Sequence, residues 1–135
     1  CPHHLFYNVL FMNGADGLDL KMNPPLRQAR DSARMIDLLR AGEIQGIETD
    51  HAPHTRQDKG PPTCASGISA LHAWPLFTEA LRYEEFSDKR IAELNHLAVV
   101  ERFGIDIDCS GKEGVYDPGA YEVNVWGKLE ERIGF

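Results

Sequence analysis

Apolar residues along this chain fall into short runs that predict strands and helices in turn. Residues 5–11 are apolar and aromatic except for Asn8, which is typical of a strand or a short buried segment. Glycines and prolines then punctuate residues 13–27 and predict a loop. Residues 44–49 have the composition of a second short strand, with Asp50 at its carboxyl end.

Three later segments have the spacing of amphipathic helices. The first covers residues 31–42, with Asp31 as the expected N-cap. The second covers residues 68–83, and the third runs from Ser87, another N-cap type, to a glycine stop at residue 104. Residues 105–135 are expected to add two or three short β-like pieces, such as residues 121–126.

Alternation of strands and helices predicts an α/β fold built on a parallel sheet. Two strands are too few for such a sheet, because parallel strands are normally covered on both faces and occur in larger sets. We therefore expect this chain to be part of a larger α/β protein. An isolated chain would expose the faces that should meet neighbouring strands.

Composition and charge exclude several classes of function. With 42% hydrophobic and 26% charged residues, the 135-residue chain has globular proportions. Its net charge of −7 and its lack of a Lys/Arg cluster argue against a nucleic-acid partner. No apolar run approaches the about 20 residues of a membrane span. Three scattered cysteines, an odd number, fit a reducing cytoplasm better than a disulfide scaffold.

The densest polar cluster is residues 48–54, where Asp50 is followed by two histidines. A carboxylate at the end of a strand with nearby histidines favours metal binding or acid–base chemistry. Asp50 and His51 point to opposite sides of an extended backbone, so we do not expect them to share one metal. His54 follows a proline and can fold back over the strand end. An N-cap aspartate with two loop histidines bonded to the backbone remains the structural alternative.

Two other polar motifs have a functional and a structural interpretation. Pro24 and Pro25 fix the backbone after Asn23, which would hold an amide donor and acceptor in place to recognise an amide or imide ring. A stiff turn beside a helix is the alternative. His3 and His4 diverge on a strand, so that one could face a site while the other packs, and a structural pair is the favoured interpretation.

At these motifs the chain resembles dihydroorotases of the amidohydrolase superfamily. The motifs are CPHHL at residues 1–5, KMNPPLR at 21–27 and TDHAPH at 49–54, and the similarity extends over residues 1–100 through Lys59 and residues 67–76. Hydantoinases and allantoinases share the Pro-Pro and Asp-His-x-Pro-His elements, whereas an Asn before Pro-Pro is similar to dihydroorotases.

The resemblance implies the C-terminal part of a (β/α)₈ TIM-type barrel, a fold of about 250 residues. Residues 1–104 would supply its last two strand–helix units, and residues 105–135 a C-terminal extension that packs on a small β domain. The other metal ligands of the family, a His-x-His pair, a bridging Lys or Asp and two further His, would lie outside this chain. One or two Zn²⁺ ions are the implied cofactor.

The implied reaction is reversible conversion of dihydroorotate to N-carbamoyl-L-aspartate in pyrimidine biosynthesis. Asp50 matches the aspartate that binds one zinc ion and shuttles a proton. Asn23 matches the amide that bonds the substrate ring, and His54 matches the histidine that contacts the substrate carboxylate. Ser66 and Gly67 match a loop whose backbone approaches the ring.

Some features depart from the family pattern and leave alternatives open. The usual Gly-Leu-Glu-Thr after the loop is Ala-Leu-His-Ala at residues 70–73, and Ser66 stands where an aromatic is common. These changes bear on loop geometry and packing. The alternatives are an inactive homologue that serves as a structural partner, a hydantoinase- or allantoinase-type amidase, and, least expected, an independent binding module. We expect a small-molecule substrate, and a homo-oligomer or an assembly with the N-terminal part of the barrel.

Overall fold

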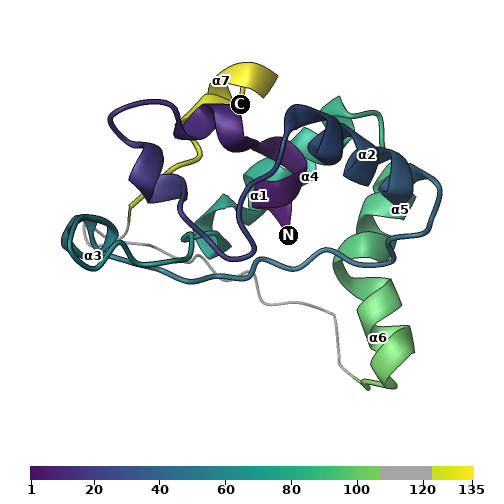
Figure 1. Ribbon diagram of the computed structural model, residues 1–135. Helices are drawn as coiled ribbons and strands as arrows, with labels where there is room; N and C mark the ends of the chain where they lie inside the picture. Colours follow the sequence, from purple (N-terminus) through teal and green to yellow (C-terminus); the bar gives the residue numbers. More distant parts are fainter. Residues whose placement is uncertain (107–122) are drawn as a thin grey trace.

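The computed structural model describes residues 1–106 and 123–135, and in this part the chain is helical with long extended connections (Figure 1). The only β pairing among the described residues is an isolated parallel bridge between His51 and Ile68. The elements in chain order are α1 (Pro2–Phe6), η1 (Val9–Met12), η2 (Gly17–Leu20), α2 (Ala29–Arg40), α3 (Arg56–Lys59), η3 (Leu71–Ala73), α4 (Trp74–Tyr83), α5 (Asp88–Ala92), η4 (Glu93–Leu97), α6 (Ala98–Phe103) and α7 (Gly127–Ile133).

The predicted strand over residues 5–11 is wrong, because its first part lies in α1 and its second in the 3₁₀ helix η1. Pro2 occupies the first turn of α1, where its fixed φ favours a helix and its missing N–H costs nothing. Asn8 then begins η1 by accepting a hydrogen bond from the N–H of Leu10 at 3.0 Å. Leu5, Phe6 and Tyr7 are buried by helix packing rather than by a sheet, whereas Val9 and Leu10 in η1 are exposed.

Residues 45–49 of the second predicted strand form an extended connection (Figure 1), but they join no ladder among the described residues. The parallel sheet is therefore not seen in this part of the chain. Of the tail, residues 107–122 lie outside the described residues, and with them part of the β-like piece expected over residues 121–126. Residues 123–126 join no strand, and residues 127–133 form the helix α7. The domain boundary near residue 104 stays a prediction.

The helices predicted from amphipathic spacing are confirmed, with shifted ends. α2 begins at Ala29 with Gln28 as its N-cap, and Asp31 sits at the third helical position, where its carboxylate accepts from the N–H of Gln28 at 3.0 Å. Asp31 is therefore half of a capping box rather than the cap itself. The third helix spans α5, a π-helical turn η4 and α6, and it ends at Gly104 with φ +60°.

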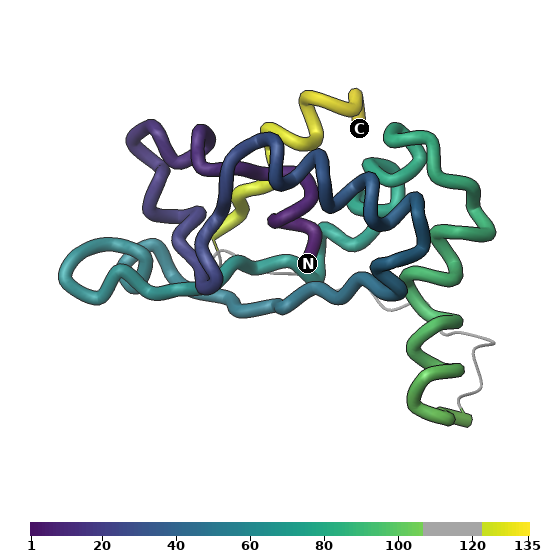
Figure 2. The backbone as a smooth tube through the Cα atoms, turned by 45° about the vertical axis from the view of Figure 1, so that its right-hand side comes forward, coloured from purple at the N-terminus to yellow at the C-terminus, as the bar shows by residue number. Residues whose placement is uncertain are grey.

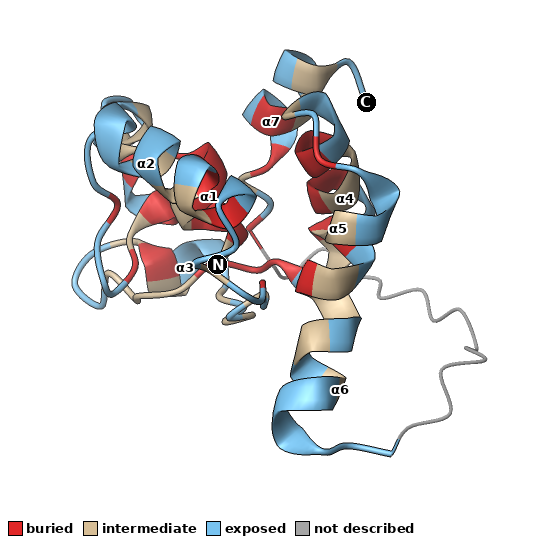
Figure 3. Ribbon diagram, turned by 90° about the vertical axis from the view of Figure 1, so that its right-hand side faces the viewer, coloured by how far each residue is buried: buried red, intermediate tan, exposed pale blue. Residues whose placement is uncertain are grey.

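Trp126 lies at the centre of the core, with no exposed surface. Its ring stacks on Tyr7 at a centroid distance of 5.2 Å and meets the edge of Phe77 at 4.6 Å. The Tyr7 hydroxyl donates to the carbonyl of Val125 at 2.6 Å. Figure 3 shows buried positions on α1, α4 and α7, whereas α6 contributes none. The segment before α7 thus joins the N-terminal helix to α4.

Replacing Trp126 by alanine should destabilise the protein by about 3–5 kcal/mol, because the substitution leaves a large cavity between two aromatic rings. Urea denaturation of the whole protein measures the change in the free energy of unfolding. Phe135→Ala is the control, since that ring is 65% exposed. Equal stability of the two variants would contradict the central position of Trp126.

Candidate active site

Three stretches of the chain meet along one edge of the molecule. Figure 2 shows the extended segment after α2 and the segment after α3 running side by side. They are joined where the N–H of Ala52 donates to the carbonyl of Ile68 at 3.0 Å. The N–H of Gly67 donates to the carbonyl of Lys21 at 3.0 Å, which brings the segment that carries Asn23 to the same place. The motifs around residues 23, 50 and 67 therefore gather without a sheet ladder.

Asp50 lies on this edge with its side chain exposed. Its φ of +48° is in the left-handed region, which aspartate tolerates better than most residues. Glu48 holds this turn, because one carboxylate oxygen accepts from the N–H of Asp50 at 2.9 Å and the other from the thiol of Cys1 at 2.7 Å. The backbone thus turns Asp50 away from the extended run that precedes it.

Cys1, His3 and Asp50 form a set of possible metal ligands. The Sγ atom, a ring nitrogen and a carboxylate oxygen of these residues all lie within 4.8 Å of one another. His3 is fully buried, and neither ring nitrogen has a hydrogen-bond partner among the described residues. Burial, reinforced by the neighbouring His4, lowers the pKa of His3 to about 3, so the imidazole is neutral at pH 7. Neutral imidazole, thiolate and carboxylate are the ligands that zinc prefers, so these residues fit the implied cofactor.

Sequence analysis did not single out Cys1, and it favoured a structural pair for His3 and His4. No local spacing could have found them, because residue 1 meets residue 50 only through the fold. The prediction that Asp50 and His51 diverge agrees with the structure. His51 faces the other way, and its Nδ1 accepts from the N–H groups of Ala70 and Leu71 at 3.0 and 3.2 Å. For His51 the structural alternative is therefore the correct one.

His54 folds back over the edge, as its place after a proline predicted. Its Nε2 lies 2.9 Å from the carbonyl oxygen of Ser66. Because a carbonyl only accepts, Nε2 carries the hydrogen, and Nδ1 is the nitrogen left for another partner. The carbonyl of His54 in turn accepts from the N–H of Val123 at 3.2 Å. The structure thus brings His54 together with the loop of Ser66 and Gly67.

Gly67 is required by the geometry of this loop. Its φ is +134°, and a Cβ at this position would lie 2.5 Å from the Cβ of Ala52 and 3.1 Å from Nε2 of His54. Only a residue without a side chain allows the loop to approach His54 this closely. Asn23 is exposed, two residues beyond the Lys21 carbonyl that binds Gly67, and its neighbour Met22 is buried.

Comparison with known proteins finds sequence relatives that are dihydroorotases. The chain is 40% identical over 96 residues to a dihydroorotase of Listeria monocytogenes serotype 4b, covering 68% of this chain and 22% of that protein. It is 40% identical over 108 residues to a dihydroorotase of Brevibacillus brevis, covering 76% of this chain and 25% of that protein. For the dihydroorotase of Bacillus subtilis strain 168 the identity is 38% over 110 residues, covering 77% of this chain and 25% of that protein. No family model matches.

These comparisons confirm the resemblance stated from the motifs. Over the matched residues this chain is homologous to dihydroorotases, and it spans about a quarter of the length of these relatives, 25% in the Bacillus subtilis protein. Its structure is similar to part of a D-hydantoinase from Bacillus sp. AR9, with a TM-score of 0.58 and 24% identity, covering 70% of this chain and 23% of that one. The structural likeness supports a piece of that fold, while the closed barrel stays a prediction.

Replacing Gly67 by alanine should destabilise the site, because the new methyl group would overlap Ala52 and the backbone would be held at an unfavourable φ. We expect a loss on the order of 2 kcal/mol in the free energy of unfolding. Gly14→Ala is the matched control, since nothing lies within 4 Å of its added Cβ. Thermal unfolding that is the same for both variants would show that the loop is not fixed as described.

Proposed function

We propose that this homologue of dihydroorotases supplies part of the active site of a zinc-dependent cyclic amide hydrolase. The reaction is the reversible conversion of dihydroorotate to N-carbamoyl-L-aspartate, a step of pyrimidine biosynthesis. The observation that supports it best is the setting of Asp50, whose exposed carboxylate is turned out of an extended segment beside sulfur and nitrogen donors. The sequence relatives at 38–40% identity favour this substrate over a hydantoin.

Asp50 is the residue of this chain that would hold the metal, with Cys1 and His3 as further possible donors within 4.8 Å. The remaining ligands are proposed to lie outside the chain. A bound zinc ion would supply Lewis acidity and lower the pKa of a coordinated water toward about 7. No helix among the described residues is long and apolar enough to cross a membrane.

Asp50 is also the proton carrier of the proposed reaction. Its carboxylate accepts the proton of the attacking water and gives it to the ring nitrogen as the C–N bond of the cyclic amide breaks. A carboxylate suits both transfers, because it is ionised before the attack and a weak acid after it. In the reverse direction the same group takes the proton from the nitrogen as the ring closes.

Asn23, His54, Ser66 and Gly67 are proposed to bind the substrate. The exposed amide of Asn23 offers a donor and an acceptor to the ring, and the loop of Ser66 and Gly67 offers main-chain groups. Since Nε2 of His54 is used by Ser66, a contact with the substrate carboxylate goes through Nδ1.

Asp50→Asn should lower kcat of the whole protein for dihydroorotate by about 10²–10⁴-fold or more, because the amide neither carries the proton nor binds metal as an anion. Steady-state kinetics and metal content of the purified variant are the measurements. Asp37→Asn is the control, an exposed carboxylate whose contact is to Arg40 of the same helix. A variant at position 50 with wild-type kcat would refute the proton-carrier role, and an inactive wild-type protein with intact metal would favour the structural-partner alternative.

Asn23→Ala and His54→Ala should act on substrate binding. Each removes a hydrogen bond to the substrate, so we expect KM to rise by about tenfold while kcat falls less. Initial rates over a range of dihydroorotate concentrations separate the two parameters. If both variants kept the wild-type KM, the assignment of the substrate side would be wrong.

A further inference from the structure

Lys59, at the end of α3, is buried, with 2% of its surface exposed. Its Nζ donates to three main-chain carbonyls, those of Gly67 at 2.7 Å, Lys21 at 2.9 Å and Ala65 at 3.2 Å. No carboxylate forms an ion pair with it among the described residues. The three N–H groups of the ammonium thus have three acceptors, and none is left without a partner.

This arrangement needs a charged lysine. A neutral amine has two N–H groups and would turn its lone pair toward the third carbonyl. The pKa of Lys59 is lowered from its usual value, mainly by burial, and the nearby Asp19 offsets this only in part. Burying an ammonium group is costly unless hydrogen bonds replace water, and three charge-assisted bonds do so here. The three bonds offset the cost of burying the ammonium group only if the three carbonyls are held in a definite arrangement.

The carbonyls that Lys59 holds belong to two of the stretches that form the site. Ala65 and Gly67 flank Ser66, and Lys21 precedes Asn23 by two residues. Other contacts strengthen the same junction: the amine of Lys21 donates to the carbonyl of Cys64, and the N–H of Gly67 donates to the carbonyl of Lys21. Each stretch thus holds the other, with Lys59 between them.

We propose that Lys59 is a positioning residue that fixes the substrate-binding loop of Ser66 and Gly67 against the segment of Asn23. This inference rests on the proposed function and deepens it, because it assigns the alignment of the two substrate-binding elements to one buried amine. Asp50 is held by other contacts, to Glu48, so its metal and proton chemistry does not depend on Lys59.

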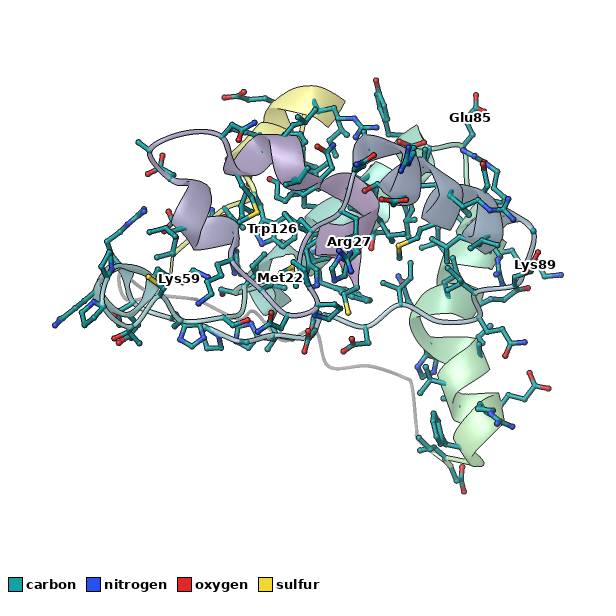
Figure 4. The ribbon with its side chains drawn as sticks, in the orientation of Figure 1. Met22, Arg27, Lys59, Glu85, Lys89 and Trp126 are labelled. Atoms are coloured by element: carbon teal, nitrogen blue, oxygen red, sulfur yellow. The ribbon has the colours of Figure 1, made fainter. Side chains whose placement is uncertain are left out.

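The test compares Lys59→Met with Lys89→Met in the whole protein. Figure 4 labels both lysines, Lys59 beside α3 and Lys89 beside α5 at the other end of the molecule, and Lys89 is exposed. Methionine keeps the length and apolar stem of lysine and removes the donors. We expect K59M to raise KM for dihydroorotate by about tenfold or more, with kcat and metal content within about threefold of K89M.

Lys59→Arg provides the second variant. It keeps the charge, but its planar guanidinium does not reproduce three donors on one nitrogen, so KM should fall between those of the wild type and K59M. If K59M does not fold, K59R alone decides, and a wild-type KM in that variant overturns the proposal. A K59M protein that loses thermal stability but keeps the KM of K89M also overturns it, because the lysine would then be structural only.

Hydrogen exchange separates this proposal from the proposed function. Amides of residues 64–67 should exchange faster in K59M than in K89M whatever the substrate is. A wild-type protein that neither binds nor converts dihydroorotate contradicts the proposed function alone. Equal exchange rates in the two variants contradict the role of Lys59 in fixing the loop, even where dihydroorotate is converted.

Discussion

The site depends on how the main chain of residues 64–71 is satisfied without a paired strand. Backbone N–H and C=O groups away from water need partners, and a sheet ladder usually provides them. Here side chains from outside this segment take much of that role, beside main-chain contacts such as that of the Ala52 N–H to the carbonyl of Ile68. The partners are Lys21 for the carbonyl of Cys64, Lys59 for those of Ala65 and Gly67, His54 for that of Ser66, Trp126 for that of Ser69 at 2.7 Å, and His51 for the N–H groups of Ala70 and Leu71.

Because side chains stand in for ladder partners, the conformation of residues 64–71 depends on particular residues. A strand ladder tolerates many side chains, whereas each of these bonds requires one residue type at one position. Trp126 is an example, since its indole N–H reaches Ser69 from the centre of the core, while its ring packs on Tyr7 and Phe77. The core and the site are therefore built from the same side chain, and loss of packing around Trp126 would also loosen the loop.

Features set by local sequence patterns, such as helices and turns, could be predicted, whereas contacts between residues far apart in the sequence could not. Helical spacing located α2 and α4, and the error at Asp31 was only its place within the capping box. The apolar run at residues 5–11 was misassigned because periodicity does not separate a short buried helix from a strand. The motif around Asp50 and the proline before His54 were informative, since a backbone turn acts locally. Buried Lys59 could not be predicted, because lysine is normally exposed and its three partners are set by the fold.

The two ends of the site are fixed by separate sets of contacts. His3 lies at the end that carries Asp50, and this position suggests its role. Lys59 and His54 hold the loop end, whereas Glu48 holds Asp50 and Cys1 at the other. A fully buried imidazole without a hydrogen-bond partner destabilises the folded state by about 1–3 kcal/mol. Its neighbours here are a thiol and a carboxylate within 4.8 Å, which are groups that bind the same metal ions as imidazole. A cation held by Asp50 would therefore offset a cost that packing of His3 alone leaves in place.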